Sequence, residues 1–165
     1  MKKMKKLILG LSLLMSVFGF GQVPHTVTFL GNSSDFNAAE QVLGGDNVEY
    51  YVTYDDTYIY IGAFRVSGNT WDNFDHFTIY FDTDPKSGVS TGGNGSTTGV
   101  DCDGNIPNLP FQADYRAAIR RDNSGESFFN TYSDSWSTGV ANAQGWTQFA
   151  DPDALEVRIP WSDLG

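Results

Sequence analysis

Cysteine is nearly absent from this sequence, since Cys102 is the only one in 165 residues. An internal disulfide framework is therefore excluded, and stability must come from a hydrophobic core or from bound metal. Long helical periodicity is missing as well. The chain also has no Gly-x-Ser-x-Gly motif, no His-Glu-x-x-His motif and no phosphate-binding loop. We therefore expect a binding domain without a catalytic role of its own.

Basic residues are scarce after the N-terminus. Residues 1–21 join the basic stretch MKKMKK to the apolar run LILGLSLLMSVFGF, which is typical of a signal peptide and too short for a spanning helix. The small residues Gly19 and Gly21 offer a cleavage site before Gln22. We expect an exported protein, located outside the cell, on the cell surface or in the periplasm, with residues 22–165 as its one domain.

Removal of the signal peptide makes the domain strongly acidic. The four lysines of residues 1–21 leave with it, so six of the ten basic residues remain against 20 acidic ones, a formal net charge of −14. Such a domain has no basic patch with which to neutralise phosphates, so nucleic acid is excluded as its main partner. It does offer many carboxylate oxygens, which are the ligands that Ca²⁺ prefers.

Short runs of alternating apolar and polar residues recur along the domain, and turn-forming residues separate them. This pattern predicts an all-β fold, an antiparallel β-sandwich of jelly-roll type. Two pairs of runs have turn sequences between them that favour hairpins, namely DDT and DNSG. The expected strands are 23–30, 48–54, 58–64, 76–82, 114–121, 126–132, 145–150 and 154–160.

Two stretches do not fit the alternating pattern. Residues 83–111 are rich in Gly, Ser and Thr and show no strand signal, so we expect a long loop, which in a compact domain is usually functional or disordered. The last residues, IPWSDLG, have little to pack on, and we expect the chain to be a fragment that lacks at least one C-terminal strand.

Four segments, in order, carry a family resemblance. VEYYVTYDDTYIYIGAFRV, DHFTIYFDTD, ADYRAAI and LEVRIPWSDLG resemble the family 9 carbohydrate-binding modules and the wider DOMON-like superfamily, over roughly residues 35–165. The resemblance implies a jelly-roll β-sandwich that clamps a glycan end between two tryptophans and holds structural Ca²⁺. Asp75 and Asp82 match the two carboxylates that bracket the central strand, whereas Thr78 departs from the acidic residue usual between them.

The same resemblance raises the question of haem, which some DOMON domains bind through methionine and histidine. No methionine follows Met15, so this ligation is excluded. A site made by His25 and His76 is not expected either. The partners that the resemblance implies are a polysaccharide or glycan end and further domains of a longer protein.

Three tryptophans in polar loops are the candidate sugar contacts: Trp71, Trp136 and Trp146. An aromatic ring covers the C–H face of a pyranose while neighbouring polar groups bond its hydroxyls. The alternative is that a loop tryptophan folds back onto the core. Arg116 shares the outward face of its strand with Arg120 and is a further candidate for sugar hydroxyls, although an ion pair with aspartate is the alternative.

Paired aspartates are the candidate metal ligands. The segments DTD and DCDGN each place side-chain oxygens two positions apart, which gives Asp82, Asp84, Asp101 and Asp103 as ligands of a structural Ca²⁺ ion. The alternative is that these residues cap turns.

Two further functions remain open beside glycan binding. One is a non-catalytic adhesion or spacer domain at the cell surface, and the other is an accessory domain of a larger secreted glycoside hydrolase. The feature that separates a sugar site from these is whether Trp71 shares an exposed cleft with Trp136 or Trp146.

Overall fold

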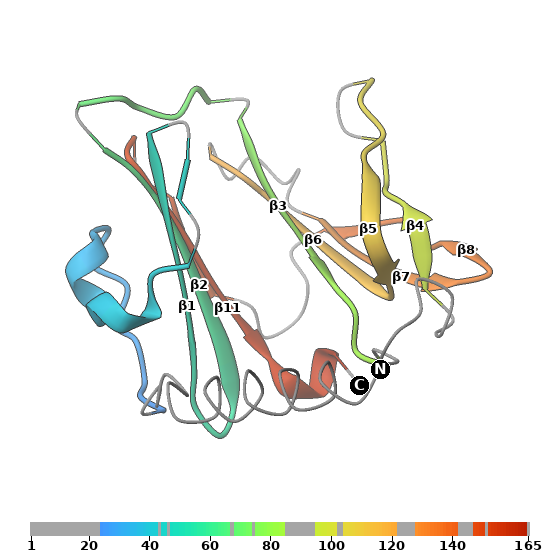
Figure 1. Ribbon diagram of the computed structural model, residues 1–165, viewed down its shortest axis with the longest axis horizontal. Coiled ribbons are helices and arrows are strands. Elements are labelled where there is room, and N and C mark those ends of the chain that lie inside the picture. Colours follow the sequence, from blue (N-terminus) through green and yellow to red (C-terminus); the bar gives the residue numbers. More distant parts are fainter. Residues whose placement is uncertain are drawn as a thin grey trace, which may run out of the picture.

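A computed structural model describes most of the domain. The described residues are 24–42, 44–45, 47–66, 68–73, 75–84, 95–101, 104–121, 128–141, 147–150 and 152–164. The predicted signal peptide lies outside the described residues. The prediction of an all-β antiparallel sandwich is confirmed (Figure 1).

Four antiparallel strands form the first sheet, in the order β1–β2–β11–β10. The first two make the predicted hairpin, with Val48 opposite Arg65. The side chain of Asp55 closes the turn between them, because its Oδ1 accepts hydrogen bonds from two backbone amides of the turn, at 2.7 and 2.8 Å. The strands are β1 (Val48–Tyr54), β2 (Tyr58–Arg65), β10 (Thr147–Ala150) and β11 (Ala154–Pro160).

The second sheet has the order β3–β6–β7–β8, and β9 also pairs with β7. The hairpin predicted across DNSG is present as β6 and β7, with Ala117 opposite Phe129. The strands are β3 (His76–Phe81), β6 (Tyr115–Arg120), β7 (Phe128–Ser133), β8 (Ser135–Trp136) and β9 (Val140–Ala141).

A two-stranded ribbon lies on the outer side of the second sheet, away from the first (Figure 1). It consists of β4 (Ser96–Thr98) and β5 (Asn108–Ala113). β4 and the first four residues of β5 fall within residues 83–111, so the prediction that this segment holds no strand is wrong. Ser-Thr-Thr has no apolar residue to signal a strand, and the short alternation of Asn-Leu-Pro-Phe-Gln-Ala is interrupted by Pro110, which is unfavourable within a sheet.

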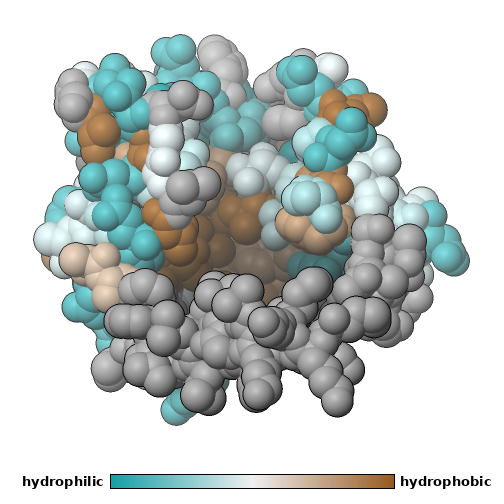
Figure 2. All heavy atoms as spheres, in the orientation of Figure 1, coloured by the Kyte–Doolittle hydropathy of each residue, from teal (hydrophilic) through white to brown (hydrophobic). Residues whose placement is uncertain are grey.

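The core lies between the facing sheets. Alternation directs apolar side chains of β2, β11 and β6 inward, and each fully buried Ile or Val stabilises the fold by about 1.5–3 kcal/mol. The central members, at most 5% exposed, are Ile61, Ala117, Ile119, Val157, Ile159 and Leu164. Phe77 and Ile79 of β3 are only half-buried. Figure 2 shows that this face is hollowed between the sheets, with hydrophobic side chains on the floor of the hollow.

The outer face of the first sheet is covered by residues 24–42, which include the short 3₁₀ helices η1 (Ser33–Asp35) and η2 (Ala38–Glu40). A third 3₁₀ helix, η3 (Trp161–Asp163), follows β11. The predicted strand over 23–30 is wrong, because residues 24–30 form no strand. Their alternation instead packs Val27 and Phe29 against the aromatic outer face of the sheet.

Candidate functional site

Trp71 lies between the two sheets rather than at an open rim. Its side chain is 9% exposed and packs with Val48 and Leu155, and the guanidinium carbon of Arg65 lies 4.2 Å from its ring centroid. Its backbone amide donates a hydrogen bond to the carbonyl of Pro152. This position favours the alternative of a loop tryptophan folded onto the core. Ligand contact by Trp71 stays a prediction that its burial does not favour.

Trp136 is half-buried on the outer face of the second sheet. Its indole Nε1 donates a hydrogen bond of 2.8 Å to the carbonyl of Thr98 on the ribbon. Its ring meets Tyr80 and Tyr132 edge-to-face, with centroids 5.9 and 5.3 Å apart. Trp136 and Trp71 thus lie on different faces of the second sheet.

The two other tryptophans contribute differently. Trp161 is 40% exposed and donates from Nε1 to the carbonyl of Asp55 at 2.9 Å. Trp146 lies outside the described residues.

Arg116 and Arg120 are on the outward face of β6, as alternation predicts, but they are only 4% and 7% exposed. The Nη1 group of Arg116 donates to Oδ1 of Asn130 at 3.0 Å, and the Nδ2 group of Asn130 donates to the carbonyl of Ser137. Arg116 therefore binds an amide rather than the aspartate considered above. A contact between Arg116 and sugar hydroxyls stays a prediction.

Three carboxylates meet where β3 ends and β6 begins. Asp82, Asp84 and Asp114 each offer one oxygen, and these oxygens lie within 4.8 Å of one another. The backbone amide of Thr83 donates to Oδ2 of Asp114 at 2.8 Å, which ties the two chain segments together. An all-oxygen set of this kind suits a hard divalent cation. These three aspartates could therefore hold a metal ion.

Asp101, another predicted metal ligand, is not part of this group. Oδ1 of Asp101 accepts a hydrogen bond of 2.8 Å from the amide of Gly104, whose φ of +81° lies in the region that glycine adopts readily. Asp101 thus caps a turn, which is the alternative considered for it. Asp103 lies outside the described residues.

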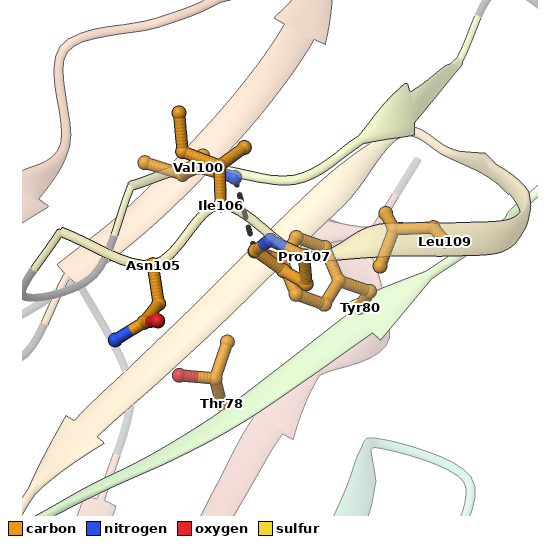
Figure 3. A pocket seen from close by; sticks show the side chains of 7 residues that line it. All are labelled: Thr78, Tyr80, Val100, Asn105, Ile106, Pro107 and Leu109. Atoms are coloured by element: carbon orange, nitrogen blue, oxygen red, sulfur yellow. Dashed lines mark hydrogen bonds between the residues drawn. The ribbon is translucent and has the colours of Figure 1, made fainter.

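An open pocket lies between β3 and the segment that joins β4 to β5. Its volume of about 510 Å³ falls within the range of roughly 300–1,000 Å³ found for ligand sites. Figure 3 shows Thr78 and Asn105 on one side of the Tyr80 ring and Leu109 on the other. We call it the outer-face pocket; the residues that line it are Thr78, Tyr80, Val100, Asn105, Ile106, Pro107 and Leu109.

Tyr80 organises the outer-face pocket. Its hydroxyl oxygen accepts a hydrogen bond of 3.0 Å from the backbone amide of Val100, which anchors the connecting segment to β3. The segment can approach because residue 99 is glycine: a Cβ there would lie 2.5 Å from the Tyr80 hydroxyl oxygen and 2.6 Å from Cγ of Pro107. The Tyr80 hydroxyl is thus occupied within the protein, and its ring forms part of the pocket wall.

Two buried carboxylates lie elsewhere, between the first sheet and residues 24–42. Glu40, 1% exposed, accepts hydrogen bonds from the hydroxyl of Thr53 at 2.7 Å and from the amide of Asn37 at 2.7 Å. His25 Nδ1 lies 3.2 Å from Glu40 Oε1, an ion pair when the imidazole is protonated. Burial raises the pKa of Glu156 on β11 to about 7, although the amide of Gly31 donates to its carboxylate. These groups hold the N-terminal segment to the sheet.

The sequence predicted neither Asp114 as a metal ligand nor any residue that lines the outer-face pocket as a ligand contact. Tyr80 reads as an ordinary strand residue, and only the fold brings the Val100–Leu109 segment over it. Asp114 begins an expected strand, and its nearness to Asp82 follows from the pairing of β3 with β6. Sequence spacing alone carries no signal for either.

No family model matches this chain, and neither a curated protein nor a solved structure matches it. The resemblance to family 9 carbohydrate-binding modules therefore stays a prediction from its motifs. What the fold defines is the class: an all-β protein of two facing antiparallel sheets. Among the described residues, no helix is both long and apolar enough to cross a membrane.

Proposed function

We propose that this chain is an exported domain, similar to a carbohydrate-binding module, that binds a glycan at the outer-face pocket. One observation carries the proposal: an open pocket that combines an aromatic ring, Tyr80, with aliphatic side chains and two small polar ones. A pyranose ring offers the complementary surface, with C–H groups on its face and hydroxyls around its edge.

Trp136 supports the pocket in this proposal. Its ring packs edge-to-face against Tyr80, and its indole N–H bonds to the ribbon, so it holds Tyr80 and the Thr98–Val100 backbone in place. A preorganised pocket loses less conformational freedom on binding than a loose one. Of these two predicted tryptophans, the geometry therefore favours Trp136 as a contributor to the glycan site, whereas Trp71 packs in the core.

The proposal includes a structural Ca²⁺ ion held by Asp82, Asp84 and Asp114. Such an ion would offset two of the three negative charges that meet there and tie the end of β3 to the start of β6. Since β3 carries Tyr80 and Asp114 follows β5 directly, the ion would also steady two walls of the pocket. Carboxylate oxygens at this spacing are the observation that supports calcium.

The test is a glycan-array screen of the exported chain in calcium buffer, with the wild type beside Ile106→Ser and Tyr80→Ala. Ile106 is 57% exposed, so its replacement leaves the core intact. The matched control is Leu30→Ser, at an aliphatic side chain that is 64% exposed on the N-terminal segment. Binding that Leu30→Ser keeps and Ile106→Ser weakens is the expected result. A folded wild-type chain that binds no glycan would overturn the proposal in favour of an adhesion or spacer domain.

A further inference from the structure

The lining of the outer-face pocket is divided by polarity. Val100 and Ile106 of the connecting segment lie beside the hydroxyl end of Tyr80, Pro107 lies over its ring, and Leu109 of β5 lies at the other end of that ring (Figure 3). Thr78 and Asn105 lie together on the other side of that ring (Figure 3). A ligand that fills the pocket must therefore have one polar edge and one apolar edge.

The apolar wall sets a condition on the ligand. Ordinary hexoses carry a hydroxyl or hydroxymethyl group at almost every ring position. A hydroxyl placed against Val100 or Leu109 would lose its water and gain no hydrogen bond, which costs free energy. The Tyr80 hydroxyl offers little relief, because it already accepts the bond from Val100. A methyl group at that position meets no such cost.

The exposure of Ile106 at the rim of the outer-face pocket also favours a ligand with an apolar group. Ile106 is 57% exposed, although isoleucine is one of the residue types most often buried. A single exposed isoleucine is ordinary, but this one borders an open pocket with three other apolar neighbours. A methyl group bound against it removes apolar surface from water on both partners.

Charge excludes another class of ligand. None of the seven residues that line the pocket is charged, and the nearest cation along the ladder, Arg116 opposite Tyr80, is 4% exposed and bound to Asn130. The domain around the pocket is strongly acidic, so uronic acids and sulfated sugars would be repelled.

We propose that the outer-face pocket selects a neutral glycan end that carries a methyl group, as a 6-deoxyhexose or an N-acetylhexosamine does. The methyl group lies against Ile106 and Val100, and the hydroxyls of the opposite edge face Thr78 and Asn105. This inference rests on the proposed glycan binding, because it names the sugar class of that same site.

The test uses matched sugars on the wild-type chain, followed by titration calorimetry. The pairs are D-glucose with 6-deoxy-D-glucose, D-galactose with 6-deoxy-D-galactose, and N-formyl-D-glucosamine with N-acetyl-D-glucosamine. Each methyl-bearing member should bind about fourfold more tightly than its partner, the gain expected for burying one methyl group. Ile106→Ser should reduce this ratio toward one, whereas Leu30→Ser should keep it.

The outcomes separate the two proposals. Equal binding within all pairs, or tighter binding of glucuronic acid than of glucose, overturns the methyl selection and leaves glycan binding intact. No binding of any sugar by a folded chain overturns both. Because the sugar series needs only the wild-type chain, the result does not depend on whether a variant folds.

Discussion

The carboxylate of Glu156 and the backbone amide of Gly31 are joined by a hydrogen bond of 3.0 Å that spans 125 positions of the sequence. The preceding amide, that of Leu30, donates to Asp35 at 2.7 Å. Glu156 thus holds the N-terminal segment to β11, while Asp35 fixes the neighbouring amide from within that segment. Glu156 is 1% exposed and its second oxygen has no hydrogen-bond partner among the described residues. Its charged form is therefore disfavoured in the fold.

Stability should fall as the pH rises from about 4.5 to about 7, and it should level off above that range. Burial, with a smaller contribution from the charge of Asp35, raises the pKa of Glu156 from 4.5 to about 7 in the fold. Between these values the folded state holds a proton that the unfolded state has lost, so its stability decreases with pH, by on the order of 2–3 kcal/mol in total. Thermal melting of the wild type from about pH 5 to about pH 8 measures this fall.

Glu156→Gln should remove that fall, because glutamine is neutral and can still accept the bond from Gly31. Asp35→Asn is the control: it removes a neighbouring negative charge and so lowers the pKa of Glu156 in the fold, and the fall should remain but end at lower pH. All other titratable groups are the same in the wild type and in Glu156→Gln, so the difference between these two curves isolates Glu156. Parallel curves for wild type and Glu156→Gln would contradict the prediction.

Trp71 should matter for stability more than for binding. Trp71→Ala removes a large ring packed with Val48 and Leu155, and it should lower the free energy of unfolding by about 3–5 kcal/mol. The matched substitution Trp161→Ala, at a tryptophan that is 40% exposed, should cost clearly less. Urea denaturation measures both. A stable Trp71→Ala chain that has lost glycan binding would restore Trp71 as the sugar platform.

Calcium should raise the melting temperature if the three-aspartate group holds it. An ion that binds only the folded state adds about 2.7 kcal/mol at one hundred times its dissociation constant. The shift should disappear on addition of EDTA and in Asp114→Asn, whereas Asp101→Asn, at an aspartate outside the group, should keep it. Equal shifts in both variants would place the ion elsewhere, and no shift in the wild type would remove calcium from the proposed function.

Gly99→Ala should loosen the outer-face pocket. The new Cβ would lie 2.5 Å from the Tyr80 hydroxyl oxygen, so the hydrogen bond to Val100 must lengthen or break. We expect a loss of roughly 1–3 kcal/mol in unfolding free energy, together with weaker glycan binding. Gly45→Ala is the control, because its Cβ would meet no atom within 4 Å. Similar behaviour of the two variants would show that close packing at Gly99 is unimportant.

The sequence correctly predicts the strands in which apolar and polar residues alternate and a turn sequence lies next to the strand. The alternation in VEYYVTY and YIYIGAF, with DDT between them, predicts β1, β2 and their pairing correctly, because a hairpin is a local structure. Alternation predicts a strand wrongly over 23–30, because Val27 and Phe29 pack against the outer face of the first sheet without joining a sheet themselves. It also misses β4 and β5, whose Ser, Thr and Pro content resembles a loop.

The candidate sites were harder to predict because each is made by distant residues. Asp82 and Asp84 are close in sequence, and their grouping is partly predicted, but Asp114 joins them only through the pairing of β3 with β6. The polar neighbours of Trp71 suggest exposure, yet its ring turns toward Val48 and Leu155. Polar flanking residues report where the backbone lies and not where a long side chain points.

The position of β11 between β2 and β10 has a kinetic consequence. The β1–β2 hairpin can form as soon as residues 48–65 are available, but β2 gains its second neighbour only from residues 154–160, with Ala154 opposite Phe64. A sheet completed by such a distant strand has a high contact order, and proteins of this kind fold in milliseconds to seconds rather than microseconds. Until then one edge of the hairpin stays unpaired, and a nascent chain in this state would depend on the cell's chaperones to keep it from aggregating.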